Sequence, residues 1–135
     1  MRNIFIATLI ASAFPGSTFA ACFLGDYSMP AEYQRSEAVI SGVVTDAHLV
    51  RDKQDPGSFS GIVYTVEISR SFRGSLHAKV NIYSENSSGR FPMELGTEYV
   101  LFLSRQGRTL VADNCGNSAP YDKSAVAALE KLGRR

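Results

Sequence analysis

The stretch 62-IVYTVEIS-69 decides the fold class of this 135-residue chain. Its apolar residues Ile62, Tyr64, Val66 and Ile68 occupy every second position, and strand side chains alternate between the two faces of a sheet. The stretch therefore predicts a strand with one buried face. Shorter runs rich in β-branched or apolar residues predict four more strands, at residues 38–49, 79–83, 99–103 and 109–112.

The hydrophobic period changes after Pro120. Apolar residues then recur three or four positions apart, which predicts a helix over residues 122–133 with Asp122 at its N-cap. Five strands and a C-terminal helix without βαβ alternation indicate an all-β fold. We expect a five-stranded antiparallel Greek-key barrel of the OB type, with an open sandwich as the alternative.

The N-terminus reads as a secretory signal peptide over residues 1–20. Arg2 precedes an apolar run of about a dozen residues, which is too short for a membrane helix. The segment 17–20 follows and ends with the small residue Ala20, after which we expect the signal peptide to be cleaved. The remaining residues, 21–135, form one domain without a transmembrane segment. We therefore expect a secreted or periplasmic protein.

The two cysteines, Cys22 and Cys115, lie near the two ends of the exported part. An oxidising compartment favours a disulfide between them. Two thiols without a neighbouring His or Cys make an incomplete metal site, which is the weaker alternative. Cleavage after Ala21 with lipidation of Cys22 is another, because residues 19–22 loosely resemble a lipoprotein signal.

Composition and motifs exclude several functions. Removal of residues 1–20 takes away Arg2 and leaves equal numbers of basic and acidic residues, so nucleic-acid binding is not expected. His48 and His77 are the two histidines, and neither adjoins a nucleophile motif or a second metal ligand. We expect no catalytic residues, no metal and no cofactor, with a small hydrolase as the remaining enzymatic alternative.

Several short patterns in one order resemble the netrin-like family, which includes the tissue inhibitors of metalloproteinases. The patterns are 36-SEAVIxGxV-44, 64-YTV-66, 72-FRG-74, 88-SGxF-91, 95-LGxxYVLF-102 and Cys115. The resemblance spans residues 22–116 and implies an OB-type barrel whose N-terminal segment is held by a disulfide.

In the metalloproteinase inhibitors of that family, the first mature residue is a cysteine whose amino group and carbonyl chelate the protease zinc. Cys22 matches this cysteine, but Ala21 precedes it and Leu24 stands where a second cysteine belongs. The chain resembles a one-disulfide bacterial secreted relative, and inhibition of a metalloprotease is the alternative function.

We expect a non-enzymatic interaction module with a protein partner, for which a protease is one candidate. The candidate contact residues are Cys22, Phe23, Leu24 and Tyr27, together with the loops 52–60 and 84–93. If Phe23 and Leu24 are exposed, they form a contact patch that the disulfide preorganises. If they are buried, they cover one end of the barrel.

Overall fold

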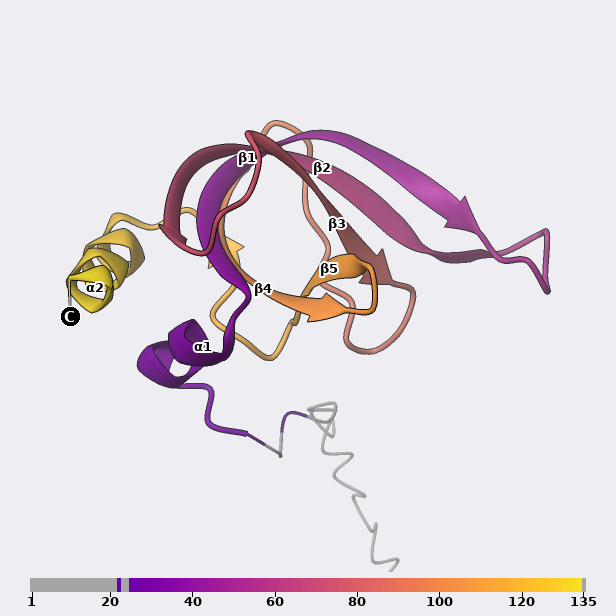
Figure 1. Cartoon of the computed structure of the whole chain (residues 1–135). Helices are drawn as coiled ribbons and strands as arrows, with labels where there is room; N and C mark the ends of the chain where they lie inside the picture. Colours follow the sequence, from indigo (N-terminus) through magenta and orange to yellow (C-terminus); the bar gives the residue numbers. More distant parts are fainter. Residues whose placement is uncertain (1–21, 23–24, 135) are drawn as a thin grey trace, which may run out of the picture.

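The computed structural model describes Cys22 and residues 25–134 (Figure 1). The predicted signal peptide, residues 1–20, lies outside this part of the chain, and so do Phe23 and Leu24. The described elements are α1 (Met29–Arg35), β1 (Ala38–Arg51), β2 (Phe59–Arg73), β3 (Lys79–Glu85), β4 (Glu98–Gln106), β5 (Thr109–Ala112), β6 (Ala119–Pro120) and α2 (Lys123–Gly133).

Five strands form a closed ring of pairings in the order β1-β2-β3-β5-β4, with β4 paired back to β1. The predicted β-rich chain with a C-terminal helix is therefore confirmed. Four of the five ladders of the ring are antiparallel, as expected. The fifth is a correction, because β3 and β5 run parallel and share the pair Ile82–Leu110. The two-residue strand β6 pairs with the outer edge of β4.

Strand β1 bends so that it can pair with two neighbours at once. Its pairing with β2 shifts register between Ser41 and Gly42 and again between Val44 and Asp46, which places bulges where the strand turns. At Gly42 a Cβ atom would lie 2.6 Å from the backbone oxygen of Glu67. A side chain at position 42 would therefore force β1 and β2 apart.

The main core lies inside the ring. Ile40, Tyr64, Val66, Ile82 and Leu101 are among the buried residues that meet there from successive strands. In β2 the buried residues Tyr64 and Val66 alternate with half-buried or exposed ones, as the sequence period predicts.

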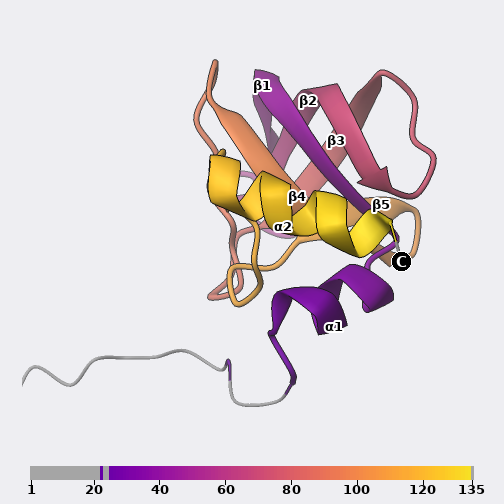
Figure 2. The same cartoon turned by 90° about the vertical axis from the view of Figure 1, so that its left-hand side faces the viewer.

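A second core covers the outer face of β1 and β4. Both helices lie on this face (Figure 2), where Val126 and Leu129 of α2 and Tyr33 of α1 pack against Val39 and Phe102. The strands β1 and β4 are thus buried on both faces over part of their length. This explains why 99-YVLFL-103 is continuously apolar instead of alternating.

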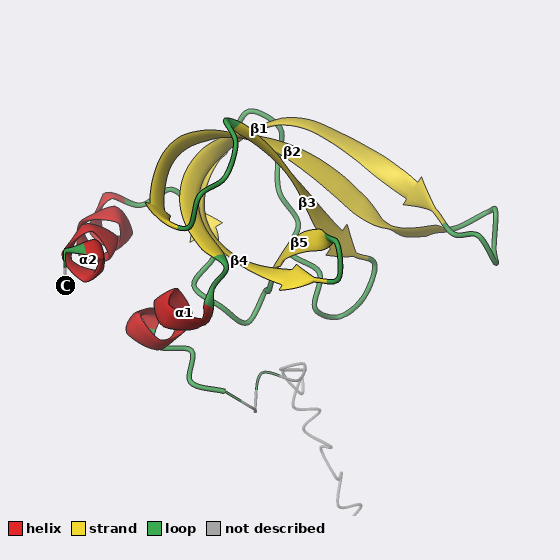
Figure 3. Cartoon of the chain, in the orientation of Figure 1, coloured by secondary structure: helices red, strands yellow, loops and turns green. Residues whose placement is uncertain are grey.

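Beyond their contact with β4, β1 and β2 continue together as an arm that points away from the helices (Figure 3), and β3 accompanies β2 as far as the pair Gly61–Glu85. The strands reach Arg51 and resume at Phe59, so the loop expected at residues 52–60 is shorter and forms the tip of the arm. Among the described residues, neither helix has the length and apolar character needed to cross a membrane.

Candidate binding site

A disulfide joins Cys22 to Cys115, as the sequence predicts, with 5.6 Å between the two Cα atoms. Cys115 lies in the segment between β5 and β6, and Cys22 is exposed. The bond therefore fixes the start of the described chain beside the last strands of the ring. A disulfide is compatible with an extracellular location.

A buried carboxylate makes a second link between the same two parts of the chain. Glu32 of α1 is only 6% exposed, and its Oε2 accepts hydrogen bonds from the backbone N–H and the side-chain Nδ2 of Asn117, each at 2.6 Å. A Cβ atom on Gly116 would lie 2.1 Å from Oε1 of Glu32. The glycine after Cys115 is thus what lets this carboxylate approach the chain.

Tyr27 lies in the segment that leads from Cys22 to α1. Its carbonyl oxygen accepts a hydrogen bond of 2.8 Å from Nδ2 of Asn117, and the Arg35 guanidinium lies 5.4 Å from the centre of its half-buried ring. Next to it, hydrogen bonds from the backbone and hydroxyl of Ser28 lower the pKa of Asp26. The segment that carries the predicted contact residue is therefore fixed in place.

The loop 84–93 reaches the disulfide end of the ring as well. Nδ2 of Asn114, which precedes Cys115, donates a hydrogen bond of 2.8 Å to the carbonyl oxygen of Ser88. At the start of the loop, the hydroxyl oxygen of Ser84 accepts a hydrogen bond of 3.1 Å from the amide of Phe91. Two of the three predicted contact regions are thus brought together, whereas the arm tip projects elsewhere (Figure 1).

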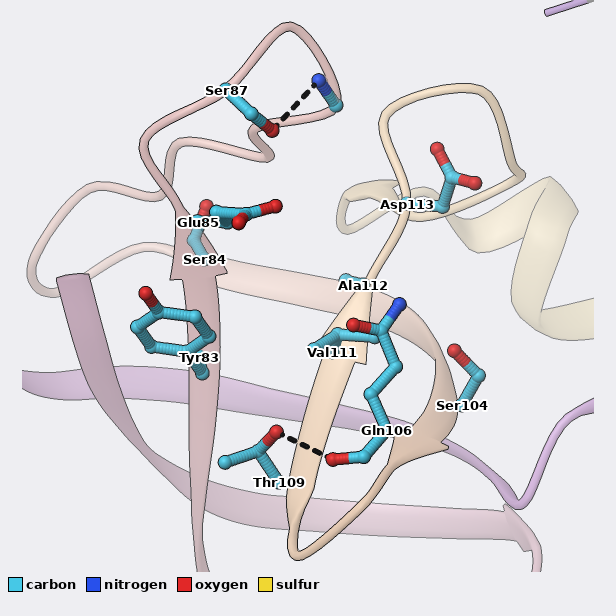
Figure 4. A pocket seen from close by; sticks show the side chains of 11 residues that line it. Tyr83, Ser84, Glu85, Ser87, Ser104, Gln106, Thr109, Val111, Ala112 and Asp113 are labelled. Atoms are coloured by element: carbon cyan, nitrogen blue, oxygen red, sulfur yellow. Dashed lines mark hydrogen bonds between the residues drawn. The ribbon is translucent and has the colours of Figure 1, made fainter. Parts of the chain in front are cut away.

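A cleft of about 320 Å³ opens beside this loop. It lies between the end of β3 and strands β4 and β5, and its lining comes from the segments 83–89, 104–106 and 109–113 (Figure 4). A smaller hollow of about 130 Å³, which Tyr27 and Arg35 line, shares Ser104 and Asp113 with the cleft. The cleft therefore adjoins the segment that the disulfide anchors.

The chemistry of the cleft is polar and acidic. Five of its eleven lining residues are serine, threonine or glutamine, and Tyr83, Val111 and Ala112 supply apolar surface. Its lining contains two carboxylates, Glu85 and Asp113, and no lysine, arginine or histidine. Within residues 25–134, neither carboxylate takes part in an ion pair.

The two histidines do not share a site. His48 is exposed on the arm, opposite Val63 of β2, and His77 is exposed in the turn before β3. Among the described residues, the structure contains no group of three or more His, Cys, Asp or Glu side chains that could hold a metal ion.

The search among protein families and among curated proteins finds no match to this chain. The resemblance to the netrin-like family therefore stays a prediction from the sequence. The sequence reading did not single out Asn114 and Asn117. Their partners Ser88, Tyr27 and Glu32 lie 26 to 90 positions away along the chain, so no local pattern indicated these contacts.

Proposed function

We propose that this chain is an exported, non-enzymatic protein-binding module, and that its partner docks on the disulfide-anchored end of the strand ring. The observation that carries the proposal is the hydrogen bond between Asn114 and Ser88. It joins the loop 84–93 to the segment that holds the disulfide, so two separate stretches of chain form one surface. A surface whose parts are already held in place loses less conformational entropy when it binds.

The ring order supports an OB-type barrel for this module. The ring pairs five strands in the order β1-β2-β3-β5-β4, with closure from β4 to β1, and this is the pairing expected of a small OB-type barrel. The proposed relationship to the netrin-like family agrees with this order, with the N-terminal disulfide and with the predicted export of the chain.

Site-specific cross-linking tests the proposal. A photoreactive amino acid replaces Ser88, on the proposed surface, or Ala127, an exposed small residue on α2, and the protein is irradiated in the compartment to which it is exported. We expect a discrete protein adduct from position 88 and none from position 127. An adduct of the same protein from both positions, or from neither, would contradict the proposal.

Inhibition of a metalloprotease is the second candidate, because Cys22 is exposed and held by its disulfide at the same end of the ring. In this mechanism the amino group at the start of the mature chain binds the protease zinc. Two extra residues ahead of Cys22 should then weaken inhibition. Equal inhibition with and without the extension would rule out chelation by this amine.

A further inference from the structure

We propose that the cleft beside the loop 84–93 binds an extended peptide segment of the partner, with a lysine or arginine side chain placed between Glu85 and Asp113. This inference rests on the proposed function and names the chemistry of its partner. It depends on three features of the cleft, which are its strand edges, its charge and its rigidity.

The strand edges provide the backbone contacts. Strands β3 and β5 are paired at Ile82 and Leu110, and beyond this point they diverge on either side of the cleft (Figure 4). Tyr83 and Ser84 pair with β2 on their other side, and Val111 pairs with β4. The two edges that face the cleft are thus without a strand partner within the described ring, and such edges bind extended peptides through main-chain hydrogen bonds.

The charge selects the side chain of the ligand. Glu85 ends β3 and Asp113 follows β5, so the two carboxylates flank the cleft from opposite sides (Figure 4). Oδ1 of Asp113 accepts a hydrogen bond of 2.9 Å from the amide of Cys115, and Oδ2 remains available to a ligand. A lysine or arginine supplies the missing cation, whereas a phosphorylated or acidic segment would be repelled.

The walls of the cleft are held before a ligand arrives. The hydroxyl of Tyr83 donates a hydrogen bond of 2.9 Å to the carbonyl oxygen of Ser60, which fixes the ring to β2. On the other wall, the disulfide of Cys115 and the bond between Asn114 and Ser88 fix the segment after β5. The cleft therefore has a defined width before binding, and the conformational entropy lost on binding is mainly that of the peptide.

The experiment uses a displayed library of random octapeptides, selected on the oxidised protein. We expect enriched sequences with one lysine or arginine flanked by β-branched or aromatic residues. Fluorescence polarisation then measures the affinity of a synthetic selected peptide for two double variants, Glu85→Gln with Asp113→Asn, and the control Asp46→Asn with Glu94→Gln. Both variants lose two negative charges, but Asp46 and Glu94 do not line the cleft.

We expect the cleft variant to bind about tenfold more weakly than the wild type, because two charge-assisted contacts are lost. The control variant should bind within about twofold. Methylation of the peptide amide next to the basic residue should weaken binding as well, because it removes a main-chain donor. Selection of peptides without a basic residue, or equal losses in both double variants, would overturn the inference.

The two proposals fail in different ways. A cross-link from position 88 together with no basic enrichment would leave the protein-binding function standing and remove the peptide cleft. Basic peptides that bind the cleft, together with no protein adduct from position 88, would leave the cleft and remove the protein partner at that surface.

Discussion

Removal of the Cys22–Cys115 disulfide is the perturbation that tests the largest single contribution to stability. We consider the variant in which serine replaces both cysteines, which removes the covalent bond with little change in side-chain size. The bond joins residues 93 positions apart. It therefore restrains nearly all of residues 22–115 when the chain is unfolded.

The magnitude follows from the length of this loop. The chain-entropy model assigns about 4.6 kcal/mol to a cross-link across roughly 90 residues at 25 °C. Part of this is offset in the variant, because residues before Tyr27 regain freedom in the folded state. Tyr27 and α1 stay in place through their hydrogen bonds to Asn117. We therefore expect the free energy of unfolding to fall by about 3 to 5 kcal/mol.

Urea unfolding measures the difference, and thermal unfolding should show a Tm lower by roughly 15 to 25 °C for a domain of this size. Wild-type protein in reductant serves as the control, and it should unfold like the variant. Reductant should have no effect on the variant itself. A loss below about 1 kcal/mol would refute the reasoning, because it would mean that the bond hardly restrains the unfolded chain.

Three further predictions concern the helices. Glu32→Ala should lower the free energy of unfolding, measured by urea unfolding, by about 2 to 4 kcal/mol, because two hydrogen bonds from Asn117 lose their charged acceptor. An unchanged free energy of unfolding would mean that water accepts these hydrogen bonds equally well in the variant. Leu129→Ala removes a fully buried side chain from the second core and should lower the free energy of unfolding by about 3 kcal/mol. The strands have their own core inside the ring, so their amide signals in NMR spectra should stay at native positions. Loss of the native strand signals would contradict the existence of two separate cores. Hydrogen bonds from the amide and hydroxyl of Ser124 lower the pKa of Asp122, so this carboxylate stabilises α2 at pH values above its unfolded pKa and loses this effect as the pH falls through its lowered folded-state pKa. The helix should therefore lose circular dichroism less steeply with falling pH in Asp122→Asn than in the wild type, and identical acid transitions would exclude this cap.

The sequence predicted three local features of the fold correctly. The two-residue period at Tyr64 and Val66 predicted β2, and the spacing of Val126 and Leu129 predicted α2 together with its cap at Asp122. Gly42 was expected to mark a bulge or bend, and the register of β1 shifts there. In each case the local pattern and the packing require the same conformation.

The differences arise where distant parts of the chain determine the outcome. Helix α1 has seven residues and no side-chain hydrogen bond at its N-cap, so its periodic signal is short. Pro30 in its first turn was the local sign that the sequence reading did not use. The parallel pairing of β3 with β5 depends on how the ring closes, and no local pattern in either strand reports it.

The candidate site was predicted only in part. The pairing of Cys22 with Cys115 is confirmed, and the sequence could predict it because the chain has two cysteines and a predicted signal peptide. The loop 84–93 was expected to be a contact region, but its neighbours Asp113 and Asn114 were not included in the site. The contact of Asn114 with Ser88 spans 26 positions and follows from the fold of the ring, which spacing along the chain does not reveal.

The pairing of β3 with β5 is the shortest junction of the ring, because it consists of the single pair Ile82–Leu110. Every other junction in the ring is held by a ladder of at least four pairs, so an outward strain concentrates at Ile82 and Leu110. Leu110 belongs to the inner core, and the disulfide at Cys115 together with the bond between Asn114 and Ser88 holds the segment that follows β5. The covalent bond and the amide contact thus supply, beside the cleft, the bracing that a longer strand ladder supplies at the other junctions.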